Sequence, residues 1–301
     1  MDENILSLQG VVKAYDKKVA VDHVSFNVAK GSIFGLLGPN GAGKTSIIRI
    51  ITGITQADSG SVYLDGALMH TRRPEKIGYM PEERGLYKKM KVGDQLLYLA
   101  RLKGLSLAHA KERIDYWMDR FQIADWWNKK VEELSKGMQQ KIQFITTIVH
   151  EPQLLILDEP FSGLDPINTN LIKEEIYKLK QQGVSIIFST HRMEQVEEIC
   201  EHIVLINNGK NVLDGDVNAI KERFKLNQYH IQYSGDSPSG LHEKLNIIAH
   251  ENNSIVIQAE EEQSSNELLR FLLSEGLNIS SFKEVLPTLN EIFIKQVEND
   301  N

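Results

Sequence analysis

The sequence predicts an α/β fold with a largely parallel central sheet, followed by a smaller α+β domain. Short, predominantly apolar segments at 33–37, 154–157, 184–188 and 203–206 have the composition of buried strands. Segments with helical spacing of apolar residues separate them, and strands that alternate with helices form parallel sheets. At 301 residues, with 41% apolar and 25% charged residues, the chain has a globular composition and room for one large domain and a small one.

The first buried strand is followed by a loop with the spacing of a phosphate-binding loop. Ile33–Leu37 leads into G-x-x-x-x-G-K-T, and a helix begins at Lys44 and Thr45. The loop consists of Gly38, Pro39, Asn40, Gly41, Ala42 and Gly43, and Ser46 continues the helix. Glycines let backbone N–H groups turn inward around an anion, and the helix N-terminus adds a positive dipole. Lys44 then reaches the β- and γ-phosphates and the Thr45 hydroxyl ligates Mg²⁺, so a nucleoside triphosphate is the predicted ligand.

Residues 5–28 alternate between apolar and polar side chains, which predicts strands of a half-exposed antiparallel sheet. Tyr15 lies on the connection between these strands, and is either a surface aromatic or a ring that stacks on a base. After the first helix, Ser61–Leu64 is a predicted strand that ends in a hairpin turn at Asp65-Gly66. Lys76–Met80 is a further short strand, and a loop follows it.

The segment 91–149 is predicted to be a helical subdomain. Asp94 and Ser106 are the predicted N-caps of its first two helices. A third helix begins within Leu134–Lys141, which reads LSKGMQQK. The segment contains Trp117, Trp126 and Trp127. An aromatic ligand box would use such residues, but packing between the helices is the simpler explanation.

Ionisable side chains follow two of the predicted buried strands. Asp158 and Glu159 come directly after Leu154–Leu157, and His191 follows the strand at 184–188. The carboxyl ends of parallel strands are where α/β sheets bind their ligands. In a chain that also has a phosphate-binding loop, these groups are expected to belong to the nucleotide site rather than to a solvated strand end.

Two domains are predicted, at 1–225 and 226–301. The second has predicted strands at Tyr229–Tyr233 and Ser254–Gln258, predicted helices around 268–272 and 289–297, and a flexible loop at Ser234–Gly240. From Leu226 onward there are 12 acidic residues and 4 lysines or arginines, a net charge of −8, whereas residues 1–225 have 29 acids and 30 bases, a net charge of +1. The acidic second domain argues against a nucleic-acid partner.

Composition also limits the location of the protein. No apolar run approaches the roughly 18 residues that a membrane-spanning helix needs. The N-terminal sequence MDENILSLQG lacks the order of a secretory signal, so a cytoplasmic location is predicted. The single Cys200 fits a reducing compartment and is better explained as a small apolar residue than as a catalytic thiol. The lysines at 88, 89 and 91 fit a solvated loop.

Five motifs occur in the order and spacing that resemble those of the ABC ATPases. They are Gly38–Thr45, Leu134–Met138, Leu157–Glu159, Ser162–Asp165 and His191. The resemblance covers residues 4 to about 225. It implies an ABC-type P-loop NTPase domain with a mixed sheet core, an antiparallel β subdomain and a helical subdomain at about 88–150. It also implies ATP as the nucleotide, Mg²⁺ as the cofactor and ATP hydrolysis as the reaction.

The resemblance assigns roles to single residues. Asp158 is similar to the aspartate that holds Mg²⁺ beside the threonine of the phosphate loop. Glu159 is similar to the catalytic carboxylate that polarises the attacking water, which requires a base within hydrogen-bond reach of that water. His191 resembles the switch histidine that contacts the γ-phosphate, and Tyr15 matches the aromatic that stacks on adenine.

The segment with Ser135 and Gly137 resembles the signature loop of the family. There the two residues contact the γ-phosphate bound by the other subunit of a head-to-tail dimer, and Asp165 is counted with the nucleotide-binding residues. Ordinary helix capping would explain Ser135 alone. The chain departs from the pattern at Glu82 in place of glutamine, Lys136 in place of glycine and Met138 in place of glutamine. A glutamate at the first of these positions still ligates Mg²⁺ but adds negative charge near the triphosphate.

A narrower resemblance, to the ATP-binding subunits of sodium-extrusion-type and related bacterial exporters, rests on GYMPEERGLY, LSKGMQQK and the acidic C-terminal part. It implies a homodimer across two ATP sites and a separate transmembrane permease that docks near Glu82–Met90. It also implies a peripheral location on the inner face of the cell membrane. The alternative is a soluble ABC-type ATPase that acts on DNA or ribosomes, but only about 90 residues without heptads separate the phosphate loop from the signature, and one cassette is present. The carboxylate of Glu159 opposes a non-hydrolysing nucleotide sensor.

Overall fold

The computed structural model describes residues 3–16, 18–69, 75–83, 85–235, 241, 245–260 and 264–299. Within it the chain forms two compact units, Met1–Asp216 and Val217–Asn301. This division lies just before helix α7 (Val217–Arg223), whereas the domain boundary predicted from the sequence lies just after it. Most of the predicted flexible loop, at 236–240, lies outside the described residues. In the described parts of the chain, no helix combines the length and the apolar character that crossing a membrane requires.

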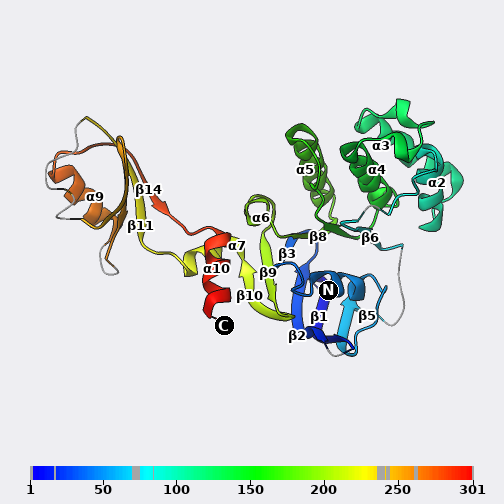
Figure 1. Cartoon of the computed structure of the whole chain (residues 1–301), viewed down its shortest axis with the longest axis horizontal. Helices are drawn as coiled ribbons and strands as arrows, with labels where there is room; N and C mark the ends of the chain where they lie inside the picture. The colour runs from blue at the N-terminus through cyan, green and yellow to red at the C-terminus, as the bar shows by residue number, and fades with distance from the viewer. Residues whose placement is uncertain are drawn as a thin grey trace. The chain divides into compact units, whose positions relative to one another are not determined.

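A six-stranded mixed sheet forms the centre of the first unit (Figure 1). Its strands are β3 (Ile33–Leu37), β6 (Ile77–Met80), β7 (Leu154–Asp158), β8 (Ser185–Thr190), β9 (His202–Asn207) and β10 (Lys210–Asp216). The order is β10-β9-β3-β8-β7-β6, and only β10 runs antiparallel to its neighbour. Every residue of β3, β7 and β8 is buried, which explains their continuous apolar sequences. The predicted parallel sheet is confirmed, and β10 makes it mixed.

A second sheet in this unit is antiparallel, with the order β2-β1-β4-β5. Its strands are β1 (Asn4–Tyr15), β2 (Lys18–Ala29), β4 (Ser59–Leu64) and β5 (Ala67–Leu68). Alternate residues such as Leu6 and Phe26 are buried in one hydrophobic core with Ile47 of helix α1 (Lys44–Ile51). Phe26 stacks on Phe34 of β3, with the ring centroids 5.2 Å apart. The elements on both sides of the phosphate loop, β3 and α1, are thus anchored in this core. The predicted antiparallel subdomain is confirmed.

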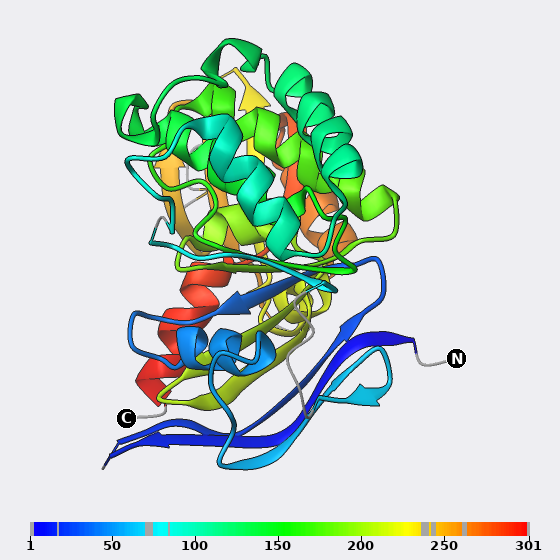
Figure 2. The same ribbon diagram turned by 90° about the vertical axis from the view of Figure 1, so that its right-hand side faces the viewer.

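Three helices form the predicted helical subdomain. They are α2 (Val92–Leu102), α3 (Leu107–Arg120) and α4 (Lys136–Ile148), with the short turns η1 (Ala124–Trp126) and η2 (Val131–Glu133) between α3 and α4. Figures 1 and 2 both show the helical subdomain and the antiparallel sheet on opposite sides of the central sheet. Helices α5 (Pro166–Gln181) and α6 (Met193–Ile199) follow β7 and β8.

Two of the three tryptophans pack within this subdomain, as predicted, whereas Trp126 lines a cavity. Trp117 is 3% exposed, and Trp127 lies so close to Gly93 that a Cβ there would be 2.3 Å from its ring. Ser106 caps α3, since its hydroxyl accepts a hydrogen bond from the N–H of His109. Asp94 is not an N-cap: the N-cap of α2 is Lys91, three residues earlier than the sequence suggests, and Asp94 lies in the first turn of the helix.

The second unit is a small α+β domain. Its strands are β11 (Gln228–Ser234), β12 (Ile247–Glu251), β13 (Ser254–Gln258) and β14 (Asn278–Val285), in the antiparallel order β12-β13-β11-β14. Leu268 and Leu272 of α9 (Ser265–Ser274) pack with Ile231 and Ile257 in a core of their own. Helices α7 and α10 (Leu289–Asn299) also belong to this unit. The edge strands β12 and β14 were not predicted, because their sequences do not alternate regularly.

Candidate functional site

The phosphate loop joins β3 to α1 at the carboxyl edge of the central sheet. Gly38 has a φ of +148° and Gly43 a φ of +114°, conformations that favour glycine. A Cβ at Gly38 would lie 2.2 Å from the carbonyl oxygen of Ile206, and one at Gly43 would lie 2.3 Å from that of Ala20. Side chains are therefore excluded at both positions, because the loop passes directly against β9 and β2. The result is a cradle of bare backbone.

Lys44 begins α1 and turns its ammonium group back into the loop. Its Nζ donates hydrogen bonds to the carbonyl oxygens of Gly38, at 2.7 Å, and Pro39, at 3.1 Å. Burial lowers the pKa of Lys44, and the negative charges of Asp158 and Glu159 oppose that shift. A cation that rests on neutral carbonyl groups is ready to exchange them for phosphate oxygens, which form stronger charge-assisted hydrogen bonds.

Asp158 ends β7 next to this loop. It is 7% exposed, and its Oδ1 accepts a hydrogen bond of 2.8 Å from the hydroxyl of Ser189. Burial raises the pKa of Asp158, the Ser189 hydrogen bond opposes this, and repulsion from Glu159 and Glu82 adds to it. Three carboxylates around one cavity thus leave an excess of negative charge that a bound cation would neutralise.

Glu159 is held firmly against the end of β8. Its Oε1 accepts a hydrogen bond from the backbone N–H of His191 at 2.9 Å and lies 2.7 Å from Nδ1 of the same residue. Its Oε2 accepts a hydrogen bond of 3.0 Å from the hydroxyl of Thr190. The backbone of Glu159 is left-handed, with a φ of +50°, which costs a non-glycine residue about 1 kcal/mol. The surrounding structure therefore imposes the position of this carboxylate.

These groups line one cavity of about 330 Å³, which we name the phosphate-loop cavity. Its lining residues are Tyr15, Lys18, Ala20, Asn40, Gly41, Gly43, Lys44, Thr45, Ser46, Glu82, Asp158, Glu159 and His191. Most of the predicted site residues are brought together here from separate parts of the chain. Gly38, Pro39 and Ala42 are not lining residues, and they shape the loop from behind.

Four residues around this cavity were not predicted. Lys18 and Ala20 line it from β2, where the register pairs Lys18 with Tyr15 across the hairpin. Ser189 and Thr190 hold the two carboxylates from β8. The sequence offered a signal for Ser189 and Thr190, because they directly precede His191 at a strand end, but no motif marks the residues on β2.

A second cavity, of about 460 Å³, contains the remaining predicted residues, and we name it the signature cavity. It is lined by Trp126, Ser135, Lys136, Gly137, Met138, Lys141, Gly163, Asp165 and Asn168. Ser135 caps α4, since its hydroxyl accepts a hydrogen bond of 3.3 Å from the N–H of Met138. Asp165 caps α5 in the same way, accepting a hydrogen bond of 2.9 Å from the N–H of Asn168. The structure therefore groups Asp165 with Ser135 and Gly137 rather than with the phosphate loop.

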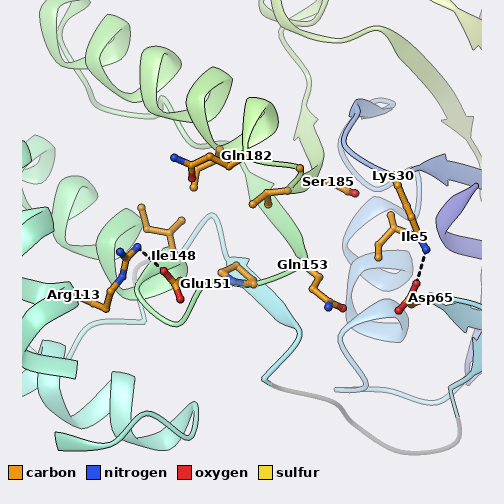
Figure 3. Close-up of a pocket in the computed structure, with 13 residues that line it drawn as sticks. Ile5, Lys30, Asp65, Arg113, Ile148, Glu151, Gln153, Gln182 and Ser185 are labelled. Atoms are coloured by element: carbon orange, nitrogen blue, oxygen red, sulfur yellow. Dashed lines mark ion pairs between the residues drawn. The ribbon is translucent and has the colours of Figure 1, made fainter. Parts of the chain in front are cut away.

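A further cavity, of about 490 Å³, lies at the amino edge of the central sheet (Figure 3). Its charged residues form ion pairs with each other, Lys30 with Asp65 at 2.7 Å and Arg113 with Glu151 at 3.0 Å. None of the predicted site residues lines it. Because parallel sheets bind ligands at their carboxyl edges, the phosphate-loop cavity is the better candidate for the nucleotide site.

The phosphate-loop cavity fits a magnesium nucleotide. Thr45, Asp158 and Glu82 supply the oxygen donors that Mg²⁺ prefers. Within the described ranges no cluster of three or more histidine, cysteine, aspartate or glutamate residues could cage a metal by itself. Mg²⁺ is commonly held by one or two carboxylates together with substrate phosphates. The bare backbone at Gly38 and Gly43 and the buried carboxylate of Asp158 therefore fit a nucleotide with bound Mg²⁺.

Comparison with known proteins finds matches to two protein families, which together cover most of the chain. The family model described as ABC transporter matches residues 21–162, and one described as the C-terminal domain of DrrA1-3-like ATP-binding proteins matches residues 215–297. The chain is 45% identical over 295 residues to the uncharacterized ABC transporter ATP-binding protein YhaQ of Bacillus subtilis, with 97% of this chain and 98% of that one covered.

Two further similarities are informative. Nod factor export ATP-binding protein I of Mesorhizobium japonicum is 33% identical over 254 residues, with 83% of this chain and 74% of that one covered. A solved structure described as the ATP-binding subunit of an ABC transporter matches with a TM-score of 0.69 and 29% identity, and covers 73% of this chain and 93% of its own.

Proposed function

We propose that this chain, which belongs to the family of ABC transporter ATP-binding proteins, is the motor of an exporter whose membrane-spanning part is a separate permease. The chain binds and hydrolyses ATP, as its family does. The observation that carries the proposal is the division of its site residues between two cavities. Lys44 and the carboxylates line one, and Ser135 and Gly137 line the other. We infer that each is half of an ATP site, completed by a second copy of the chain.

The phosphate-loop cavity supplies the groups that hold ATP. The phosphates lie along the inward-facing N–H groups of the loop, and Lys44 transfers its hydrogen bonds from loop carbonyls to phosphate oxygens. Thr45, Asp158 and Glu82 hold Mg²⁺, which neutralises charge on the phosphates when it is bound. Tyr15 is 40% exposed, and Nζ of Lys13 lies over its ring at 5.6 Å from the centroid, so the opposite face of the ring would stack on adenine.

Glu159 and His191 are placed to act on the γ-phosphate. A carboxylate must lie within hydrogen-bond reach of the attacking water to orient it and to accept its proton. Glu159 lines the cavity but shares one of its oxygens with Nδ1 of His191, whose side chain is 53% exposed. Rotation of the imidazole toward the phosphate would free one acceptor position of that oxygen for water, while the backbone N–H of His191 keeps its hydrogen bond to the same oxygen. His191 would then contact the γ-phosphate while Glu159 acts as the base.

The proposed homodimer would also cover an exposed isoleucine that is next in sequence to a lining residue of the signature cavity, Asn168. Ile167, which follows Asp165 and Pro166, is 82% exposed, an unusual value for an isoleucine. A second copy in head-to-tail orientation would cover it and bring a γ-phosphate to Ser135 and Gly137 at the N-terminus of α4. Two ATP molecules would then hold the dimer together, and hydrolysis would weaken it, because the hydrolysed products bind the dimer less well.

Replacing Glu159 with glutamine tests the composite site. This substitution keeps the shape of the side chain but removes the base, so ATP should accumulate unhydrolysed between two subunits. We expect Glu159→Gln to elute as a dimer on size exclusion with ATP and Mg²⁺, and as a monomer without nucleotide. The same variant with Lys44→Ala should stay monomeric, because it cannot hold the triphosphate. A Glu159→Gln variant that remains monomeric at saturating ATP rules the composite site out.

An apolar cavity on the helical subdomain fits a helix of the permease. Its volume is about 490 Å³, and it is lined by Tyr79, Pro81, Gly85, Leu86, Leu99, Leu102, Lys103, Gln143, Thr146 and Thr147. Leu102, one of the lining residues, is 61% exposed, and Tyr87 and Tyr98, which are next in sequence to the lining residues Leu86 and Leu99, are 52% and 42% exposed. The buried Oε1 of Gln143 has no hydrogen-bond partner among the residues that the structure describes. A docking helix would cover the apolar groups and donate a hydrogen bond to this oxygen.

Export through a separate permease is supported by two further observations. The name of the Mesorhizobium relative includes export, and the described helices of the present chain cannot cross a membrane. The chain would accordingly lie on the cytoplasmic face of the cell membrane, bound to its permease rather than to lipid. The acidic second unit fits this better than the alternative, an ATPase that acts on DNA or ribosomes.

Affinity capture from solubilised membranes tests the permease. The tagged full-length chain should recover a protein with several membrane spans, and Leu102→Glu should abolish the recovery because it places a charge in the docking cavity. Leu107→Glu is a matched control, since Leu107 is 50% exposed but does not line that cavity. Recovery of ribosomal proteins or DNA, with no membrane protein, would favour the alternative function.

A further inference from the structure

Among the residues that the structure describes, the half-buried lysines have partners, with one exception. Five of them form ion pairs: Lys13 with Asp58, Lys76 with Asp65, Lys129 with Asp125, Lys173 with Glu198 and Lys180 with Glu201. Lys44 and Lys103 donate hydrogen bonds to backbone carbonyl oxygens. Lys221 also makes an interaction. Lys141 is equally half-buried, yet in the described ranges it has neither a hydrogen bond nor an ion pair. It lines the signature cavity. It is unfavourable to withdraw an ammonium group from water without giving it an acceptor. The position of Lys141 therefore indicates that its ammonium group binds a ligand.

The nearest acid does not satisfy Lys141. Asp165 lies in the same cavity, but its carboxylate already accepts hydrogen bonds from the N–H of Asn168 at 2.9 Å and from its Nδ2 at 2.5 Å. Burial lowers the pKa of Lys141, and the charge of Asp165 opposes that shift only in part. The ammonium group is therefore attracted by the charge of Asp165 but forms no hydrogen bond or ion pair with any described residue.

The position of Lys141 in α4 directs its side chain toward the N-terminus of that helix. In a helix the Cα–Cβ bonds tilt toward the N-terminus, so a long side chain reaches back over the preceding turn. For Lys141 that is the turn beginning at Ser135, where α4 presents its free N–H groups and positive dipole to the cavity. Lys136 stands at the same end, exposed and without an acidic partner among the described residues.

The charges of the two cavities are complementary. The signature cavity has two lysines, Lys136 and Lys141, and one acid, Asp165. The phosphate-loop cavity has three carboxylates and two lysines, and must also accept a triphosphate. In a head-to-tail dimer each cavity faces the other kind, so the positive lining of one meets the negative charge that accumulates in the other.

We propose that Lys141 is a phosphate ligand in trans: its ammonium group binds the γ-phosphate of the ATP held by the second copy, with Lys136 at the mouth of the same cavity. This inference rests on the proposed dimer and adds to it a residue outside Ser135 and Gly137. It also gives a reason for a lysine at position 136, since a second cation strengthens the attraction of the cavity for the triphosphate.

The test uses the full chain with Glu159→Gln, so that ATP is bound but not hydrolysed. Lys141→Met removes the charge and keeps the length of the side chain, Lys141→Arg restores a cation, and Lys111→Met is the control for loss of an exposed lysine on α3. The dimer dissociation constant at saturating ATP is measured by sedimentation, and binding of a fluorescent ATP analogue to the monomer is measured separately.

We expect Lys141→Met to raise the dimer dissociation constant about a hundredfold, roughly tenfold for each of two sites. Lys141→Arg should recover most of this loss and Lys111→Met should cause none. Nucleotide binding to the monomer should not change, because Lys141 is absent from the phosphate-loop cavity.

Thermal unfolding separates ligand binding from a structural role. If Lys141 waits for an anion, Lys141→Met removes an unsatisfied charge, and the variant without nucleotide should unfold at the same or a higher temperature than the parent. A lower unfolding temperature together with weak dimerisation would mean that Lys141 holds α4 in place, and would overturn the proposal. Unchanged dimerisation of Lys141→Met would overturn it and leave the composite site intact, whereas a parent that never dimerises would overturn both.

Discussion

At the residue scale, the charged groups of the two cavities are held before their final partners arrive. Lys44 rests on the carbonyl oxygens of Gly38 and Pro39, Asp158 on the hydroxyl of Ser189, and Lys141 on no group in the described structure. Each is at least half-buried, so each loses hydration that neutral neighbours replace only in part. The binding of ATP with Mg²⁺ supplies the opposite charges that all of them lack, and this favours the loaded state.

The role of Lys44 can be tested directly. Lys44→Ala removes the ammonium group that donates hydrogen bonds to the carbonyl oxygens of Gly38 and Pro39. ATP turnover should fall by at least about a hundredfold, the usual loss for a missing charge-stabilising group. Phosphate release at saturating ATP is the measurement. Lys111→Ala, on the exposed face of α3, should hydrolyse ATP at the parent rate. Turnover that persists in Lys44→Ala would contradict the assignment of the phosphate loop.

At the element scale, an ion-pair network ties the helical subdomain to α5. Glu175 of α5 is 1% exposed, and its Oε1 lies 2.5 Å from Nη2 of Arg120 in α3 and 2.9 Å from Nζ of Lys178. The helix that begins at Asp165, in the signature cavity, is thereby joined to the subdomain that supplies Ser135. We expect this link to restrain the separation of the two walls of the signature cavity.

Removing the charge of Glu175 should weaken this link. Glu175→Gln leaves Arg120 without its buried counter-ion, and we expect a loss of about 2 kcal/mol in the free energy of unfolding, below the 3–5 typical of fully buried pairs because Arg120 is partly exposed. Urea denaturation measures it. Glu174→Gln is the matched control: that carboxylate is 3.8 Å from Arg120 and mostly exposed, so its loss should change stability by less than about 0.5 kcal/mol. Equal effects of the two substitutions would show that the buried position gives Glu175 no special weight.

At the scale of the whole molecule, the chain contains two units, each with a hydrophobic core of its own. The first has its own core around the phosphate loop and both cavities of the proposed ATP sites. The second has a separate core between α9 and its sheet, and an excess of negative charge. It matches the C-terminal domain of DrrA1-3-like proteins, so the family relationship extends over both units.

The sequence by itself determined the fold of the first unit and the chemistry of its nucleotide site. Buried parallel strands are continuous apolar runs, and a phosphate loop needs glycines at fixed spacing, so both can be read from local patterns. The start of α2 could not be predicted from a local pattern. Aspartate is a residue type favoured at N-caps, but the helix already includes Val92 and Gly93, and Gly93 packs against Trp127, which is distant in the sequence. Edge strands such as β12 escaped for a related reason, since an exposed strand has no need of regular alternation.

Only the tertiary structure decided which of the predicted residues lie together. Asp165 and Glu159 are six positions apart in the sequence, yet Asp165 joins Ser135 in the signature cavity and Glu159 joins Lys44 in the phosphate-loop cavity. The partner of a lysine is likewise invisible in the sequence, because it depends on which atoms the fold brings within hydrogen-bond distance. Lys141 differs from the other half-buried lysines of the described chain for that reason: the fold withdraws it from water and places none of the described acceptors within hydrogen-bond distance of its ammonium group.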